Sequence, residues 1–85
     1  MVDSDKQVPE IRLTSLKRYE CGVVAEMQAP DQELRRLMSM GVCEGRTVEV
    51  VQTGDPLILK VFGSRIGVSA RLAERVFVTP SAVVR

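Results

Sequence analysis

Short runs of β-branched and aliphatic residues, interrupted by glycine and proline, constrain the fold of this 85-residue chain more than any other feature. The clearest run is 46–53, RTVEVVQT, which is typical of a β-strand because branched side chains pack well on a pleated sheet. The Gly-Asp-Pro sequence at 54–56 predicts a turn, and LILKVF at 57–62 predicts the returning strand. We therefore predict a β-hairpin over residues 46–62.

Further strands are predicted on both sides of this hairpin. The segment GVVAEM at 22–27 indicates a strand, and the period of two places Val23, Ala25 and Met27 on one face. Two shorter strands complete the set: one within 12–19, anchored by Leu13 and Leu16, and one at 76–78. The chain thus predicts about five strands, all of them short.

One helix is predicted between the second strand and the hairpin, over about residues 32–40. Asp31 precedes it and can accept hydrogen bonds from the free N–H groups of the first turn. Gly41 follows it and can adopt the left-handed conformation that ends a helix at low cost. The spacing expected for residues that face the core is found at Leu34, Leu37 and Met38.

Short strands at this spacing in so small a chain favour a mainly β fold, closed or half-closed into a small barrel, because closure removes sheet edges. We predict a break around residues 63–67 and a short helical turn over about 69–75, capped by Ser69. The organisation is a single domain at 11–79, with a flexible leader at 1–10 and a tail at 80–85.

The absence of histidine narrows the chemistry that this chain can perform. Ser-His-Asp and Cys-His catalytic sites both require an imidazole, and so do the zinc sites of metalloproteases. No G-x-G-x-x-G or G-x-x-x-x-G-K motif is present to bind phosphates. We therefore expect a protein that is not an enzyme.

The start of the chain is polar and acidic, without the apolar run of a signal peptide, and no stretch is long and apolar enough to span a membrane. We therefore expect a cytoplasmic protein with reduced thiols.

A second interpretation is metal binding at the two places where a thiol and a carboxylate adjoin. The metal would be a divalent transition metal such as Fe²⁺ or Zn²⁺, held in one chain or bridging two. The simpler interpretation is two thiols that pack as small apolar groups beside solvated carboxylates. The residues concerned are Glu20, Cys21, Cys43 and Glu44.

Nucleic-acid binding is a third, less favoured interpretation. Arg65, Arg71 and Arg75 could contact phosphates, but the net charge is only +1, and one Tyr and two Phe supply few surfaces for base stacking. We therefore expect no nucleic acid among the partners.

A longer pattern points to a family. The frame LxxRLxxMGxxxG begins at Leu34 and resembles the FeoA family of small accessory proteins for bacterial ferrous-iron uptake. The ordered set of matching structural positions is Leu34, Leu37, Gly41, Gly45, Pro56, Gly63 and Leu72, together with Arg36 and Met40. The segment 64–71 departs from the family, whose members often carry a more apolar strand there.

This resemblance implies an SH3-like β-barrel with an inserted helix. It also implies a protein–protein interaction module for FeoB, the membrane ferrous-iron transporter, which would recruit the chain to the inner face of the cytoplasmic membrane. No cofactor is required for such a role, and a weak homodimer is expected. We assign contact with the partner to Arg36, Met40, Arg65 and Arg71.

Overall fold

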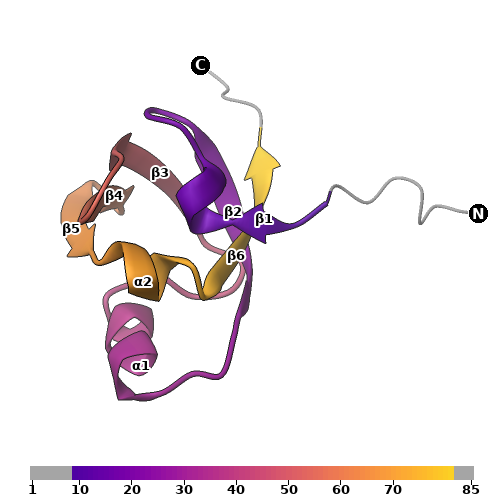
Figure 1. Cartoon of the computed structure of the whole chain (residues 1–85), viewed down its shortest axis with the longest axis vertical. Coiled ribbons are helices and arrows are strands. Elements are labelled where there is room, and N and C mark those ends of the chain that lie inside the picture. Colours follow the sequence, from indigo (N-terminus) through magenta and orange to yellow (C-terminus); the bar gives the residue numbers. More distant parts are fainter. Residues whose placement is uncertain (1–8, 82–85) are drawn as a thin grey trace, which may run out of the picture.

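The computed structural model describes residues 9–81, which fold as one bent antiparallel sheet with two helices beside it (Figure 1). The elements in chain order are β1 (Ile11–Arg12), the 3₁₀ helix η2 (Leu13–Ser15), β2 (Cys21–Met27), α1 (Gln32–Ser39), β3 (Thr47–Gln52), β4 (Leu57–Val61), β5 (Ser64–Val68), α2 (Ala70–Ala73) and β6 (Val76–Ser81). The predicted mainly β fold, with an inserted helix and a short helical turn, is confirmed.

The sheet has six strands in the order β1-β6-β2-β3-β4-β5, so β1 and β5 are its two edges. It is therefore half-closed: within residues 9–81 the two edges do not pair with each other, while η2 and α2 contact one another. None of the described helices is long and apolar enough to cross a membrane.

The core lies inside this bent sheet and contains no buried polar or charged residue among those described. Both predicted anchors of the first segment, Leu13 and Leu16, are buried there. Val24 and Met27 belong to the core, whereas Val23 and Ala25 are only half-buried, so the face predicted for β2 was wrong. A shift of register between Val24 and Glu26 explains this, because an extra residue moves the following side chains to the opposite face. The core residues are Leu13, Leu16, Val24, Met27, Leu34, Leu37, Val42, Val48, Val50, Leu57, Leu59, Val61, Val68, Ala73, Val76 and Val78.

Two segments differ from the sequence-based prediction. The expected break at 63–67 contains the strand β5, which pairs with β4 in a hairpin closed by Phe62 and Gly63 alone. The expected tail begins too early, since β6 continues through Pro80 and Ser81, which pair with Gly22 and Cys21. Residues 1–8 of the leader and 82–85 of the tail lie outside the described residues.

Candidate functional site

Helix α1 is held by its apolar side and presents the other side to solvent. Leu34 and Leu37 are buried, and the Asp31 carboxylate accepts a hydrogen bond of 3.0 Å from the Leu34 N–H, as predicted for the cap. Met38, which we expected in the core, is exposed, because an eight-residue helix against a bent sheet buries only a narrow stripe. Arg36 is exposed and forms no ion pair with any other described residue.

Arg75 ties the loop before α1 to the rest of the fold. Its guanidinium donates to Asp31 Oδ2 at 3.0 Å and to the backbone carbonyls of Gln28 and Ala29. Ala29 has a positive φ of 47°, which is unusual for a residue with a Cβ, so these bonds help to hold a strained loop. Arg75 is therefore engaged within the fold, and the suggestion that it contacts phosphates gains no support from this geometry.

The same contacts act on the Asp31 carboxyl. The hydrogen bond from the Leu34 N–H, and then the bond from Arg75, lower the pKa of Asp31 below its ordinary value. Both interactions favour the ionised form, because each donor is attracted to a carboxylate more than to a neutral acid. The helix entry is therefore fixed by a charged group.

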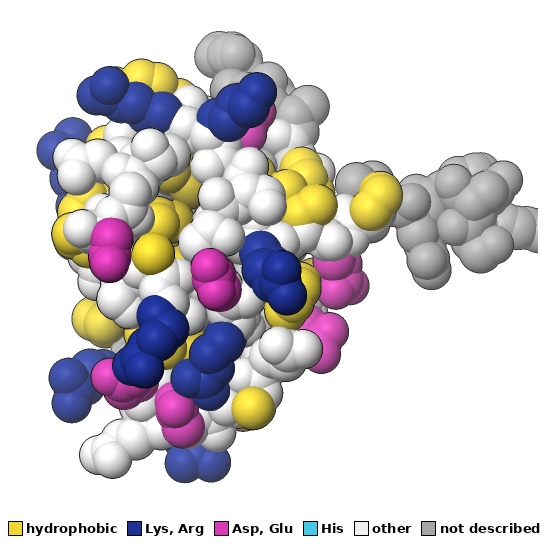
Figure 2. All heavy atoms as spheres, viewed as in Figure 1, with side chains coloured by type: hydrophobic (Ala, Val, Ile, Leu, Met, Phe, Trp, Pro, Cys, Tyr) yellow, Lys and Arg dark blue, Asp and Glu magenta, His cyan; other side chains and the backbone are white. Residues whose placement is uncertain are grey.

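A groove of about 310 Å³ opens between α1, the end of β5 and α2. Its lining is mixed, with apolar side chains from both helices and polar ones at the rim: Glu33, Arg36, Leu37, Met40, Gly67, Ser69 and Leu72. Figure 2 shows Lys and Arg side chains over this region, with acidic ones among them. A hollow of this size, lined by both apolar and charged side chains, is a candidate binding site.

The groove collects two of the four residues that we assigned to partner contact and has the others beside it. Arg36 and Met40 line it. Arg71 reaches it through an ion pair of 3.9 Å with Glu33, and both side chains are largely exposed. Arg65 lies two residues before Gly67, so the two project from the same face of β5.

The structural positions of the family pattern have clear roles. Gly41 and Gly45 both have positive φ, at 108° and 88°, as predicted. Gly63 also has a positive φ in the β4–β5 turn, and Pro56 precedes β4 in the turn after β3. Leu72 lines the groove.

Phe62 is one of the residues of this face that sequence reasoning missed. We placed it in the strand 57–62, but it occupies the hairpin tip, with φ of 55° and 72% of its surface exposed. The Arg46 guanidinium lies 4.1 Å from the centre of its ring, and the ring packs near Gly41 at the end of α1. The available signal was Gly63 at the end of the predicted strand, because a two-residue turn of this kind favours glycine at its second central position.

The four metal candidates do not form a cluster. Within residues 9–81 no three Cys, Asp or Glu side chains lie close enough to hold one ion. Glu20 accepts a hydrogen bond of 2.7 Å from the Lys17 N–H and so stabilises a turn. Burial, and then the Glu49 carboxylate, raise the pKa of the Cys21 thiol, which disfavours the thiolate that metals bind. The prediction that this chain binds metal therefore gains no support from the geometry.

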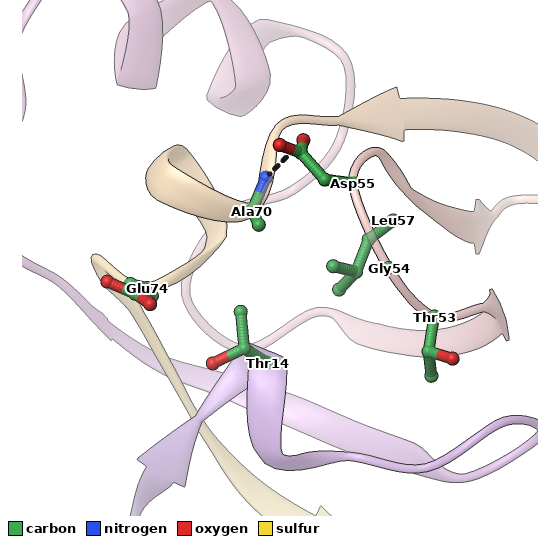
Figure 3. Close-up of a pocket in the computed structure, with 7 residues that line it drawn as sticks. All are labelled: Thr14, Thr53, Gly54, Asp55, Leu57, Ala70 and Glu74. Atoms are coloured by element: carbon green, nitrogen blue, oxygen red, sulfur yellow. Dashed lines mark hydrogen bonds between the residues drawn. The ribbon is translucent and has the colours of Figure 1, made fainter.

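A second hollow of about 320 Å³ lies between η2, the β3–β4 turn and α2 (Figure 3). Asp55, one of the two acidic residues that line it, accepts a hydrogen bond of 3.0 Å from the Ala70 N–H at the start of α2. That carboxylate is thus engaged in joining a turn to a helix, and none of the residues assigned to partner contact lines this hollow.

A bent antiparallel sheet with a helix inserted between its second and third strands, and a groove beside that helix, defines a small SH3-like domain. The model of the FeoA domain family matches residues 11–80, nearly the whole of the described part. The chain therefore belongs to the FeoA family, which is associated with ferrous-iron transport.

Solved structures agree with this assignment. A crystal structure of an iron uptake regulatory protein (FeoA) is 27% identical, with a TM-score of 0.79 over 87% of this chain and 100% of that one. A zinc-complexed FeoA from Stenotrophomonas maltophilia, described as a prokaryotic SH3 domain protein and a candidate activating factor for ferrous iron transport, is 31% identical, with a TM-score of 0.72 over 80% of this chain and 88% of that one.

The fold also occurs inside larger proteins. A manganese-dependent transcriptional repressor matches with a TM-score of 0.78 at 18% identity, over 88% of this chain but only 44% of that one. A search of curated proteins found no match.

Proposed function

We propose that this protein is a non-enzymatic accessory protein of bacterial ferrous-iron uptake, and that it acts by binding the cytosolic part of the membrane transporter FeoB. Membership of the FeoA family supports the link to iron transport. The description of the S. maltophilia relative as a candidate transport activating factor supports an accessory role.

The observation that carries the proposal is a partly apolar face with nothing from this chain covering it in residues 9–81. The groove holds Met40, which is 43% exposed, and Phe62 projects beside the end of α1. Exposed aromatic and methionine side chains next to arginine are the composition found at the centre of protein–protein interfaces. Arg36 supplies the charged group on this face.

Titration calorimetry of the purified protein with the cytosolic domain of FeoB, with and without guanine nucleotide, tests this proposal. We expect saturable binding that Arg36→Ala weakens by about tenfold, since truncating an interface arginine commonly removes more than 1 kcal/mol. Arg35→Ala is the matched control, because Arg35 is the neighbouring exposed arginine and does not line the groove.

Two results together would remove the proposal. The first is the absence of binding in either nucleotide state, and the second is normal ferrous-iron uptake in a strain that lacks this gene. Equal weakening by Arg35→Ala and Arg36→Ala would instead place the interface elsewhere on the molecule.

A further inference from the structure

The sheet ends in a free edge next to the groove. β5 is the last strand in the order β1-β6-β2-β3-β4-β5, and its five residues make a longer edge than the two residues of β1 at the opposite end. A free edge carries backbone N–H and C=O groups that can pair with another strand. Only those backbone groups of β5 that do not bond to β4 are free for such pairing.

The register of β4 and β5 shows which backbone groups of β5 are free. Val61 pairs with Ser64 across a two-residue turn in which Phe62 and Gly63 both have positive φ. In such a hairpin the pair that flanks the turn exchanges hydrogen bonds, and bonded and non-bonded pairs then alternate. Lys60–Arg65 and Ile58–Gly67 are therefore the non-bonded pairs. The backbone N–H and C=O groups of Arg65 and Gly67 consequently point away from β4, towards the open side.

These two residues connect the edge to the groove. Gly67 lines the groove, and Arg65 projects from the same face. A strand added along β5 would therefore run past the floor formed by Leu37, Met40 and Leu72. Side chains on one face of that strand would alternate with those on the other, so every second residue would face the groove.

The side chains around this edge are mainly basic, which favours an acidic binding partner. Arg65 stands opposite Lys60 on the neighbouring strand, and Arg36 and Arg71 lie on the two helices that border the groove. The acidic residue that lines the groove, Glu33, is already within 3.9 Å of Arg71. A segment with acidic residues is complementary to this surface.

A second copy of this chain fits the edge less well. Two β5 strands related by a two-fold axis would bring Arg65 of one copy close to Arg65 of the other, with a Lys60 on the strand behind each. Like charges across paired strands are destabilising, and basic residues on edge strands commonly prevent self-pairing.

We propose that β5 receives an extended acidic segment of the partner as an added strand, paired through the backbone of Arg65 and Gly67, with an apolar side chain in the groove. This inference rests on the proposed function for the identity of the partner. The added element is the mode of binding, which is strand pairing at the β5 edge.

Amide hydrogen exchange of the wild-type protein, read by NMR, tests the inference with two probes. One is the cytosolic domain of FeoB, and the other is a synthetic peptide Glu-Thr-Val-Thr-Glu, whose one face carries both glutamates and the valine, with Lys-Thr-Val-Thr-Lys as control. In the free protein we expect fast exchange at Arg65 and Gly67 and slow exchange at Ile66, whose N–H faces β4. Both the FeoB domain and the acidic peptide should slow exchange at Arg65 and Gly67, and the lysine peptide should not.

A pair of variants tests the backbone contact directly. Gly67→Pro removes the outward N–H without removing a bond to β4, and Pro is tolerated on an edge strand in that position. Gly67→Ala keeps the N–H, and its Cβ would meet only Ile58 Cδ1 at 3.8 Å, an ordinary contact. We expect Gly67→Pro to weaken binding of the FeoB domain by about three- to tenfold, the effect of one lost hydrogen bond, and Gly67→Ala to leave it nearly unchanged.

The outcomes separate the two proposals. Binding of the FeoB domain without added protection at Arg65 and Gly67 would overturn the strand-pairing inference and leave the proposed function standing. Protection by the acidic peptide without binding of the FeoB domain would support the inference and reject the proposed partner. Protection that rises with protein concentration alone would identify a second copy as the occupant and overturn the inference. The exchange measurement uses the wild-type chain, so it stands even if Gly67→Pro does not fold.

Discussion

Arg75 illustrates how a single residue can have a role that its sequence context does not indicate. In the sequence it is one of several basic residues in the second half of the chain. In the fold it joins the end of α2 to the loop between β2 and α1 through one carboxylate and two carbonyl groups. Its contacts within the fold therefore contribute to stability.

Replacing Arg75 tests this role. Arg75→Ala should lower the free energy of unfolding by about 1–2 kcal/mol, because the loop carbonyls lose a charged donor. Urea unfolding measures the change, and Arg71→Ala is the control, since its exposed ion pair should contribute less than about 1 kcal/mol. Equal losses in the two variants would contradict the role assigned to Arg75.

The lowered pKa of Asp31 should make the free energy of unfolding depend on pH. Its pKa is lower in the folded chain than in the unfolded one, so the stability it contributes is fully present above the unfolded value of about 3.9 and is lost as pH falls through the folded value. Asp31→Asn keeps a good helix cap but removes the titrating group.

Urea unfolding of both proteins at a series of pH values between neutral and strongly acidic measures the effect of Asp31. The wild type should lose stability relative to Asp31→Asn only on the acidic side of pH 4. Parallel curves for the two proteins would show that Asp31 makes no such contribution.

Substitution of Phe62 should weaken partner binding while leaving the stability of the fold nearly unchanged. Asn tolerates positive φ better than Phe, which offsets the loss of the ring's contact with Arg46, a contact worth about 0.5–1 kcal/mol at an exposed site. Phe62→Asn should therefore unfold at nearly the same urea concentration as the wild type while binding the FeoB domain more weakly. A clearly destabilised variant that binds normally would contradict the assignment of Phe62 to the binding face.

At the scale of elements, the junction between α1 and the hairpin depends on glycine conformation. Gly41 and Gly45 both have positive φ, but their surroundings differ. A Cβ on Gly41 would lie 3.1 Å from Val61 Cγ1, whereas one on Gly45 would meet nothing within 4 Å. The two positions thus separate backbone strain from crowding.

Alanine at each position measures the two effects. Gly45→Ala should lose about 1–2 kcal/mol from the left-handed backbone alone, and Gly41→Ala should lose more, because Val61 must also move. Gly41→Val should be worse again, and should lose stability before it loses binding. Thermal unfolding is the measurement. An unchanged midpoint for Gly41→Val would contradict the helix end assigned here.

The elements themselves were largely predictable, because their signals are local. The hairpin 46–62, the cap at Asp31 and the short helix after Ser69 each follow from neighbouring residues, and the structure contains all three. The face of β2 was not predictable, because the bulge near Ala25 depends on pairing with β6, far away in the sequence. β5 was missed because Ser64, Arg65 and Gly67 are weak strand formers, and its pairing with β4 supplies what its own residues lack.

The candidate site was predictable only in part, for the same reason. Arg36 and Met40 were found through the family pattern, and the fold brings them to one groove. Gly67 and Phe62 were missed, since one acts through its backbone at an edge and the other through exposure at a turn. Both properties depend on how strands pair across the sheet.

For the whole molecule, the central claim is that one face, formed by α1, the β4–β5 turn, β5 and α2, binds a protein partner. Figure 1 shows these elements on one side, with β1, β2 and β6 on the other. Partner binding should therefore affect one half of the molecule and spare the other.

NMR chemical-shift mapping with the cytosolic domain of FeoB tests this claim most directly. We predict that the amide signals which move cluster at residues 36–41 and 62–72, while those of β1 and β6 stay in place. Shifts that cluster on β1 and β6, or spectra that do not change at saturating partner, would contradict the account.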